Sequence, residues 1–151
     1  MTHDELRTTN ESTGGTGKGP RNGLLFLCDG SAAHSQMAEA FARFIGPSDM
    51  RYYSASSTAG SLHPNAIKAM RELGIDISRY PVKPLGDIPL DTVATIITLC
   101  AEERCPALPA GITHLSWPMP DPADQVGEEE ELLHGFRRVR DEIREFVSRL
   151  F

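Results

Sequence analysis

The sequence predicts an α/β protein with an open, four-stranded parallel sheet and helices on both faces. Short apolar runs alternate along the chain with longer segments whose apolar residues repeat at the helical period. The apolar runs are nearly continuous, which is typical of parallel strands buried on both sides. A chain that alternates strand and helix returns each strand parallel to the last one and covers the sheet with the intervening helices.

The first predicted strand covers residues 24–27 (LLFL) and ends at Cys28. Residues 35–45 place apolar side chains at helical spacing and predict the first helix, with Ser35 as the candidate N-cap. Gly46, followed by a proline, is expected to end this helix. Strand and helix would then be joined by a six-residue loop.

The middle of the chain predicts two further strands with a helix between them. Residues 50–56 form the candidate second strand, and residues 63–73 form a helix that Gly74 would terminate. Residues 92–99 (TVATIITL) are rich in β-branched side chains and predict the third strand. Cys100 directly follows that strand.

The remaining elements complete a single domain. Residues 112–117 predict a fourth short strand, and residues 128–151 keep the 3.6-residue period of a long closing helix. Residues 1–22 are rich in Thr, Ser, Gly and Asn and are interpreted as a flexible tail. We therefore expect one domain over residues 23–151, which agrees with a chain length of 151.

The charge balance and the composition exclude several classes of partner. The chain has 15 Lys+Arg against 21 Asp+Glu, a net charge of −6, which disfavours binding to nucleic acid or to an anionic membrane surface. No run approaches the roughly 20 apolar residues of a membrane span, and residues 1–9 lack the apolar core of a signal peptide. We expect a cytoplasmic protein whose 3 cysteines are free or reactive thiols.

Cys28 occupies a position suited to oxyanion chemistry. In open α/β sheets, ligands bind outside the carboxyl ends of the strands. The loop after Cys28 leads into a helix N-terminus, where backbone N–H groups and the helix dipole attract an anion and favour a thiolate. A buried cysteine that merely fills space is the competing interpretation. The residues expected to surround the anion are Asp29, Gly30, Ser31, Ala32, Ala33, His34 and Ser35.

Several motifs together resemble one enzyme family. They run in order from LFLC and SQMAEA, through STAG with HP, LGIDIS, TLC and CP, to a tryptophan followed by DPA, and they cover nearly the whole domain. In this order and spacing the sequence is similar to the low-molecular-weight tyrosine phosphatase superfamily, and specifically to its thioredoxin-coupled arsenate reductases. The resemblance implies the fold of that family and binding of arsenate or a similar oxyanion.

The anion loop departs from the family pattern at three positions. The family motif is C-x5-R, and His34 stands where its arginine would grip the anion with two parallel hydrogen bonds. Ser31 replaces the usual Asn, and Ala32 the usual Ser. Because imidazole has an ordinary pKa of about 6.5 and is mostly neutral at pH 7, we expect weakened arsenate binding.

Two further cysteines favour reduction over phosphate hydrolysis. A phosphatase of this superfamily needs one nucleophilic cysteine, whereas a reductase needs additional thiols to carry two electrons away. The resemblance implies that Cys28 attacks arsenate, Cys100 attacks Cys28, and Cys105 attacks Cys100. It also implies that thioredoxin or a related redoxin is the reductant, with no bound cofactor. Asp121, which precedes a proline, matches the family's general acid. An ordinary Asp-Pro turn with no catalytic role would have the same sequence.

Three other functions stay open at this point. The chain is a catalytically impaired family member that binds an oxyanion or a protein, or it is a tyrosine phosphatase. Alternatively, Cys28, Cys100, Cys105 and His34 form a metal or metalloid site, although their spacing matches no standard zinc motif. The main hypothesis is arsenate reduction through Cys28, Cys100, Cys105 and Asp121.

Overall fold

The computed structural model describes residues 21–28, 33–57, 62–80, 82–99, 108, 110–119 and 127–151. In these residues the strands form one sheet in the order β2-β1-β3-β4, and every pair is parallel. The predicted open, four-stranded parallel sheet is confirmed. Its strands are β1 (Gly23–Cys28), β2 (Arg51–Ser56), β3 (Val93–Thr98) and β4 (Thr113–Ser116).

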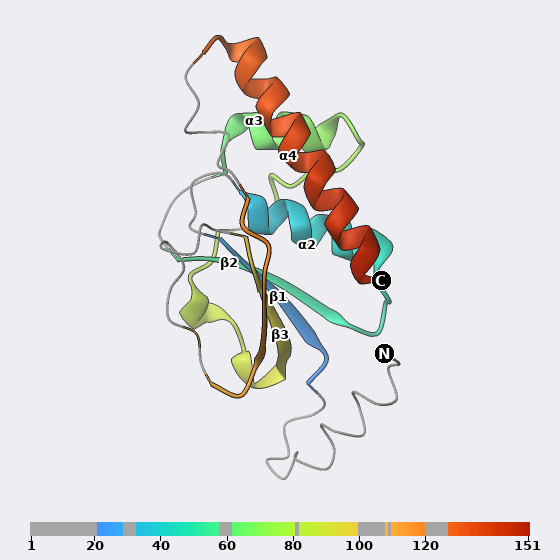
Figure 1. Ribbon diagram of the computed structural model, residues 1–151, viewed down its shortest axis with the longest axis vertical. Coiled ribbons are helices and arrows are strands. Elements are labelled where there is room, and N and C mark those ends of the chain that lie inside the picture. The colour runs from blue at the N-terminus through green and yellow to red at the C-terminus, as the bar shows by residue number, and fades with distance from the viewer. Residues whose placement is uncertain are drawn as a thin grey trace.

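Alternate side chains of β1 separate two hydrophobic layers. Leu24 and Phe26 belong to a cluster with the apolar faces of α2 (His34–Ile45), α3 (Pro64–Arg71) and α4 (Glu129–Leu150). Leu25 and Leu27 belong to a second cluster on the opposite face of the sheet. That face is covered, as far as the structure is described, by two one-turn 3-10 helices, η1 (Leu85–Asp87) and η2 (Leu90–Thr92). Figure 1 shows α4 crossing over α2 and α3.

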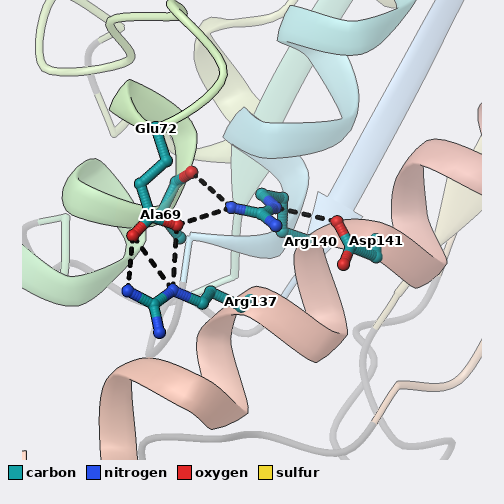
Figure 2. Close-up of polar contacts among 5 residues, drawn as sticks. All are labelled: Ala69, Glu72, Arg137, Arg140 and Asp141. Atoms are coloured by element: carbon teal, nitrogen blue, oxygen red, sulfur yellow. Dashed lines mark hydrogen bonds and ion pairs between the residues drawn. The ribbon is translucent and has the colours of Figure 1, made fainter. Parts of the chain in front are cut away.

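Charged side chains reinforce the contact between α3 and α4. The guanidinium of Arg137 donates to both oxygens of the Glu72 carboxylate, at 2.9 and 3.0 Å from Nε and at 2.6 Å from Nη2. Nη1 of Arg140 donates to the same carboxylate at 2.8 Å and to the carbonyl oxygen of Ala69 at 2.9 Å. Figure 2 shows that Arg137 and Arg140 both bind the carboxylate of Glu72, just after the last residue of α3, and that Arg140 also binds Ala69. These polar contacts join α3 and α4 at the surface, in addition to the apolar contacts between the two helices.

The ends of the helices correct one prediction and confirm another. Ser35 does not cap α2, because the helix begins one residue earlier and Ala33 occupies the N-cap position without a side-chain hydrogen bond. The left-handed glycine expected after α3 is present: Gly74 adopts φ +79° and donates its N–H to Arg71 O at 2.9 Å, although the helix itself ends at Arg71 with Glu72 as its C-cap. Only glycine takes this left-handed conformation at little cost.

His63 joins the start of α3 to α4. Its Nδ1 accepts a hydrogen bond from the backbone N–H of Asn65 at 3.1 Å, so the imidazole caps the helix. Its ring stacks on that of Phe136, with the centroids 4.6 Å apart. This histidine therefore serves packing and capping.

Asn22 ties the chain to β2 just before the first strand. Its carbonyl oxygen accepts from the N–H of Arg51 at 3.2 Å, and its side-chain amide donates to Asp49 O at 2.6 Å. The predicted tail lies outside the described residues as far as residue 20. In the described part of the chain, no helix combines the length and the apolar composition needed to cross a bilayer.

Candidate active site

Cys28 is the last residue of β1, at the carboxyl edge of the sheet. Its thiol is free and the residue is only 1% exposed. The side chain lies on the face of the sheet that carries α2, since Leu24 and Phe26 point the same way and strand side chains alternate. This is the edge at which open parallel sheets bind their ligands.

Two serine hydroxyls contact the sulfur of Cys28. Ser35 Oγ, from the first turn of α2, lies 3.0 Å from Sγ, and Ser56 Oγ, from the end of β2, lies 3.6 Å from it. Ser35 also donates its hydroxyl proton to Oε1 of Gln36 at 3.1 Å. All four residues are buried. The thiol therefore sits in a small, buried polar cluster.

The residue just before α2 has an unusual backbone conformation. Ala33 adopts φ 70° and ψ 24°, the only left-handed non-glycine residue in the described part of the chain. This conformation costs an alanine about 1–2 kcal/mol, so the surroundings must enforce it. A left-handed residue next to right-handed ones turns successive N–H groups to one side. Together with the positive end of the helix dipole, this favours an oxyanion in front of the helix.

His34 is the first residue of α2 and is almost completely buried, with 4% of its surface exposed. It occupies the position at which the C-x5-R motif has arginine. An imidazole is shorter than a guanidinium side chain and has no fork of parallel donors. The structure thus buries His34 at the start of α2 and does not expose it on the surface.

Backbone hydrogen bonds bring the other predicted segments to the same edge. The N–H of Leu99, which precedes Cys100, donates to Leu27 O at 2.8 Å, beside Cys28. The N–H of Met119 in turn donates to Leu99 O at 3.2 Å. The chain leading to Cys100 and the chain leading towards Asp121 are therefore both attached where β1 ends.

The described residues test only part of the predicted site. They include Cys28, Ala33, His34 and Ser35, which the structure brings together at the start of α2. The predicted residues that lie outside the described part are Asp29, Gly30, Ser31, Ala32, Cys100, Cys105 and Asp121.

Sequence reasoning missed two polar residues of the cluster, Ser56 and Gln36. Ser56 is the Cα partner of Cys28 in the parallel ladder, a register that the sequence does not reveal. Gln36 follows Ser35 directly, and a long amide at a buried helical position was the available signal. Nε2 of Gln36 is buried and has no hydrogen-bond partner among the described residues.

A metal centre finds no support in the described residues. They contain no group of three His, Cys, Asp or Glu side chains placed to hold a metal ion. Two cysteines of the hypothesised metal or metalloid site lie outside the described part, so the whole set stays a hypothesis.

The fold and the site define a class of protein: a parallel α/β domain with a buried free cysteine at the end of its first strand, next to the N-terminus of the following helix. The chain belongs to the low molecular weight phosphotyrosine protein phosphatase family, whose model matches residues 23–151. The family predicted from the motifs is thus confirmed.

Individual relatives that match most of the chain have a more specific name than the family does. The chain is 42% identical over 128 residues to an arsenate reductase of Bacillus licheniformis, covering 83% of this chain and 92% of the relative. It superimposes on a solved arsenate reductase in the oxidized state with a TM-score of 0.71 and 30% identity, covering 85% of this chain and 95% of the other. A thioredoxin-dependent arsenate reductase of Corynebacterium glutamicum matches with a TM-score of 0.58 and 25% identity, covering 98% of this chain and 72% of that one.

Proposed function

We propose that this chain reduces arsenate to arsenite by a cascade of thiol attacks that starts at Cys28. The observation that carries the proposal is the buried Cys28 thiol at the N-terminus of α2, where its sulfur lies 3.0 Å from Ser35 Oγ. Named arsenate reductases that match most of the chain support it.

The first step forms a bond between sulfur and arsenic. The thiolate of Cys28 attacks As(V) and displaces one oxygen, which leaves as water after Asp121 protonates it. The N-terminus of α2 and the loop before it hold the remaining oxygens, with their negative charge facing the helix dipole. This step changes no oxidation state.

The second step moves two electrons to arsenic, and the third step exchanges one disulfide for another within the chain. The thiolate of Cys100 attacks Sγ of Cys28, and the electron pair of the S–As bond stays on arsenic, which leaves as As(III) in arsenite. The thiolate of Cys105 then attacks Cys100 and releases Cys28 as a thiolate. A dithiol redoxin reduces the resulting Cys100–Cys105 disulfide and supplies the two electrons. The attachment of Leu99 to Leu27 favours the second step, because it holds the strand before Cys100 against the strand before Cys28.

The reductant is a dithiol protein of the thioredoxin type. The relative from Corynebacterium glutamicum, which is called thioredoxin-dependent, supports this part of the proposal. A reducing compartment such as the cytoplasm supplies such a dithiol and keeps the 3 cysteines reduced between turnovers.

A single turnover without any redoxin tests the cascade. The fully reduced chain, mixed with excess arsenate, should release about one arsenite per chain and stop, because the cascade consumes one pair of thiols. Peptide mass mapping should then find the Cys100–Cys105 disulfide. Arsenite release without that disulfide, or no release at all, would contradict the proposed cascade.

The burial of His34 favours one second candidate, a family member that binds an oxyanion without turning it over. An enclosed imidazole in place of the arginine leaves the anion with fewer charged donors. Binding of phosphate or arsenate in calorimetry, with no arsenite and no aryl-phosphate hydrolysis, would identify this candidate.

A further inference from the structure

The second hydroxyl at Cys28 belongs to Ser56 and is placed by the sheet. Ser56 is the Cα partner of Cys28 in the parallel pairing of β1 and β2, so the two side chains leave the sheet on the same face. The residue is 2% exposed, and its Oγ lies 3.6 Å from Sγ. Sulfur is a large acceptor, and a contact of this length is within the reach of a hydroxyl.

The backbone around Ser56 is fixed from both sides. Its own N–H donates to Lys83 O at 2.8 Å, and the N–H of Ser57 donates to Cys28 O at 2.9 Å. The hydroxyl can therefore change its position only by rotating about one side-chain bond between staggered rotamers. Little side-chain entropy is therefore lost when the Ser56 hydroxyl points at the sulfur of Cys28.

The distribution of protons separates the roles of the two serines. Ser35 has one hydroxyl proton and gives it to Gln36 Oε1, while in its contact with Cys28 Sγ either atom can be the donor. Within the described residues, the only hydrogen-bond partner of the Ser56 hydroxyl is Cys28 Sγ. When Cys28 loses its proton, the Ser56 hydroxyl therefore has a proton for which no other described acceptor competes.

We propose that Ser56 is a positioning residue that donates its hydroxyl proton to the Cys28 thiolate and so increases the ionised fraction of Cys28 near neutral pH. A hydrogen bond to the charged form of a group stabilises that form, and such bonds are stronger than neutral ones. The inference rests on the proposed function only in taking Cys28 as the reacting thiol.

A titration of Cys28 alone tests this role. The chain has 3 cysteines, so the Cys100→Ser/Cys105→Ser double variant keeps Cys28 as its single thiol. The ultraviolet absorbance of the thiolate is followed against pH, with a blank that also carries Cys28→Ser to remove the tyrosine contribution. Ser56→Ala in this background should raise the midpoint by about 0.5–1 pH unit, the size expected of one long charge-assisted hydrogen bond.

Ser54 provides a matched control on the same strand. It is two residues before Ser56, on the same face, and is also buried, but its hydroxyl donates to Glu39 Oε1 at 2.5 Å and not to Cys28. Ser54→Ala should lower thermal stability and leave the thiolate midpoint in place. An equal shift with both alanine variants would show a general effect of loosening β2 and would overturn the proposal.

A hydroxyl-retaining variant separates chemistry from packing. Ser56→Thr keeps the donor and suits a strand, so its midpoint should stay close to that of the parent. If Ser56→Ala leaves the midpoint unchanged while the protein remains folded, the proposal is wrong. It is equally wrong if threonine shifts the midpoint as far as alanine does.

The titration contains no arsenate, so it stands apart from the proposed function. In the full cascade, Ser56→Ala should lower kcat/KM about three- to tenfold at pH values below the midpoint and recover at higher pH. A shifted midpoint in a chain that reduces no arsenate would refute the proposed function and leave the role of Ser56 intact. Arsenate reduction with an unshifted midpoint would refute the role of Ser56 alone.

Discussion

Ser35 Oγ lies 3.0 Å from Cys28 Sγ, so a residue in the first turn of α2 touches the last residue of β1. The contact spans the loop that is expected to hold the anion, and it fixes the two ends of that loop relative to each other. Because both residues are buried, the hydrogen bond forms in surroundings of low dielectric, where its direction has a large effect on the charge of the thiol.

Gln36 controls that direction, and its removal should have an effect opposite to that of Ser56→Ala. In the structure Gln36 Oε1 takes the Ser35 proton. Gln36→Leu keeps the volume and frees this proton to point at Cys28, so the thiolate midpoint should fall by about half a pH unit.

A double-mutant cycle checks this route through Ser35. Adding Gln36→Leu to Ser35→Ala should leave the midpoint of the Ser35→Ala protein unchanged, because no hydroxyl remains to be redirected. An equal fall in both backgrounds would mean that Gln36 acts on Cys28 by some other route. All variants are titrated by thiolate absorbance in the single-cysteine background.

Arsenate binding should improve when the missing guanidinium is restored. In His34→Arg a forked cation faces the anion, and one charge-assisted hydrogen bond contributes about 1.5–3 kcal/mol, so the KM for arsenate should fall about tenfold or more. His34→Gln, which is uncharged and of similar size, is the control and should not lower KM. Steady-state kinetics at fixed redoxin concentration measures both. A folded His34→Arg protein with unchanged or slower turnover would contradict our account of the loop.

The Glu72 cluster should make the α3–α4 contact sensitive to acid. Hydrogen bonds from Arg137 and then Arg140 hold the pKa of Glu72 below its ordinary value of 4.5. A lowered pKa in the folded state means a contribution to stability that is complete above pH 4.5 and is lost as the pH falls through the folded value. Glu72→Gln should therefore lower the Tm at pH 7, and its difference from the wild type should shrink below pH 4.5.

An exposed pair between the same helices serves as the control for Glu72. Lys68 and Glu129 are 3.1 Å apart, with side chains 52% and 76% exposed. Surface pairs of this kind contribute little to stability, so Glu129→Gln should change the Tm less than Glu72→Gln does. If both variants lower the Tm equally at pH 7, the Glu72 cluster (Figure 2) contributes no more to stability than the exposed pair does, which would contradict this prediction.

Tyr52 should link stability to alkaline pH. Burial, with a smaller effect of Asp49, raises the pKa of Tyr52 to about 12, and its hydroxyl donates to Pro47 O at 2.7 Å. Since an unfolded tyrosine ionises near pH 10, this contribution is complete below about pH 10 and is lost between there and pH 12. Tyr52→Phe should cost about 1 kcal/mol at pH 7 for the lost hydrogen bond.

Urea unfolding at several pH values measures the effect of Tyr52. The gap between wild type and Tyr52→Phe should narrow as the pH rises from 9 towards 11, because only the wild type has this phenol to ionise. A gap that stays constant over this range would show that Tyr52 ionises equally easily in the folded and unfolded chain.

The sequence predicted the layers of the fold better than the details of the site. The apolar run before Cys28 and the 3.6-residue period of the last helix follow from burial, which is a local pattern in the sequence. The contact of Ser56 with Cys28 depends on strand register, and register is set by the packed sheet.

The N-cap prediction failed at Ser35 for a related reason. A serine before a helix is normally a cap, but here Ala33 takes the cap position with a left-handed backbone. This leaves the Ser35 hydroxyl free of capping and places it on Cys28 and Gln36. The contacts of the Ser35 hydroxyl with Cys28 and Gln36 thus replace the N-cap role that the sequence predicted for it.

The central claim is a three-thiol reduction of arsenate, and a coupled assay tests it most directly. Arsenate-dependent oxidation of NADPH, through thioredoxin reductase and thioredoxin, is measured for the wild type and for Cys28→Ser, Cys100→Ser and Cys105→Ser. We predict turnover by the wild type and its loss in each variant, because each thiol makes a bond that no other can make. Turnover that survives Cys28→Ser, or a wild type inactive with every dithiol reductant, would contradict the account.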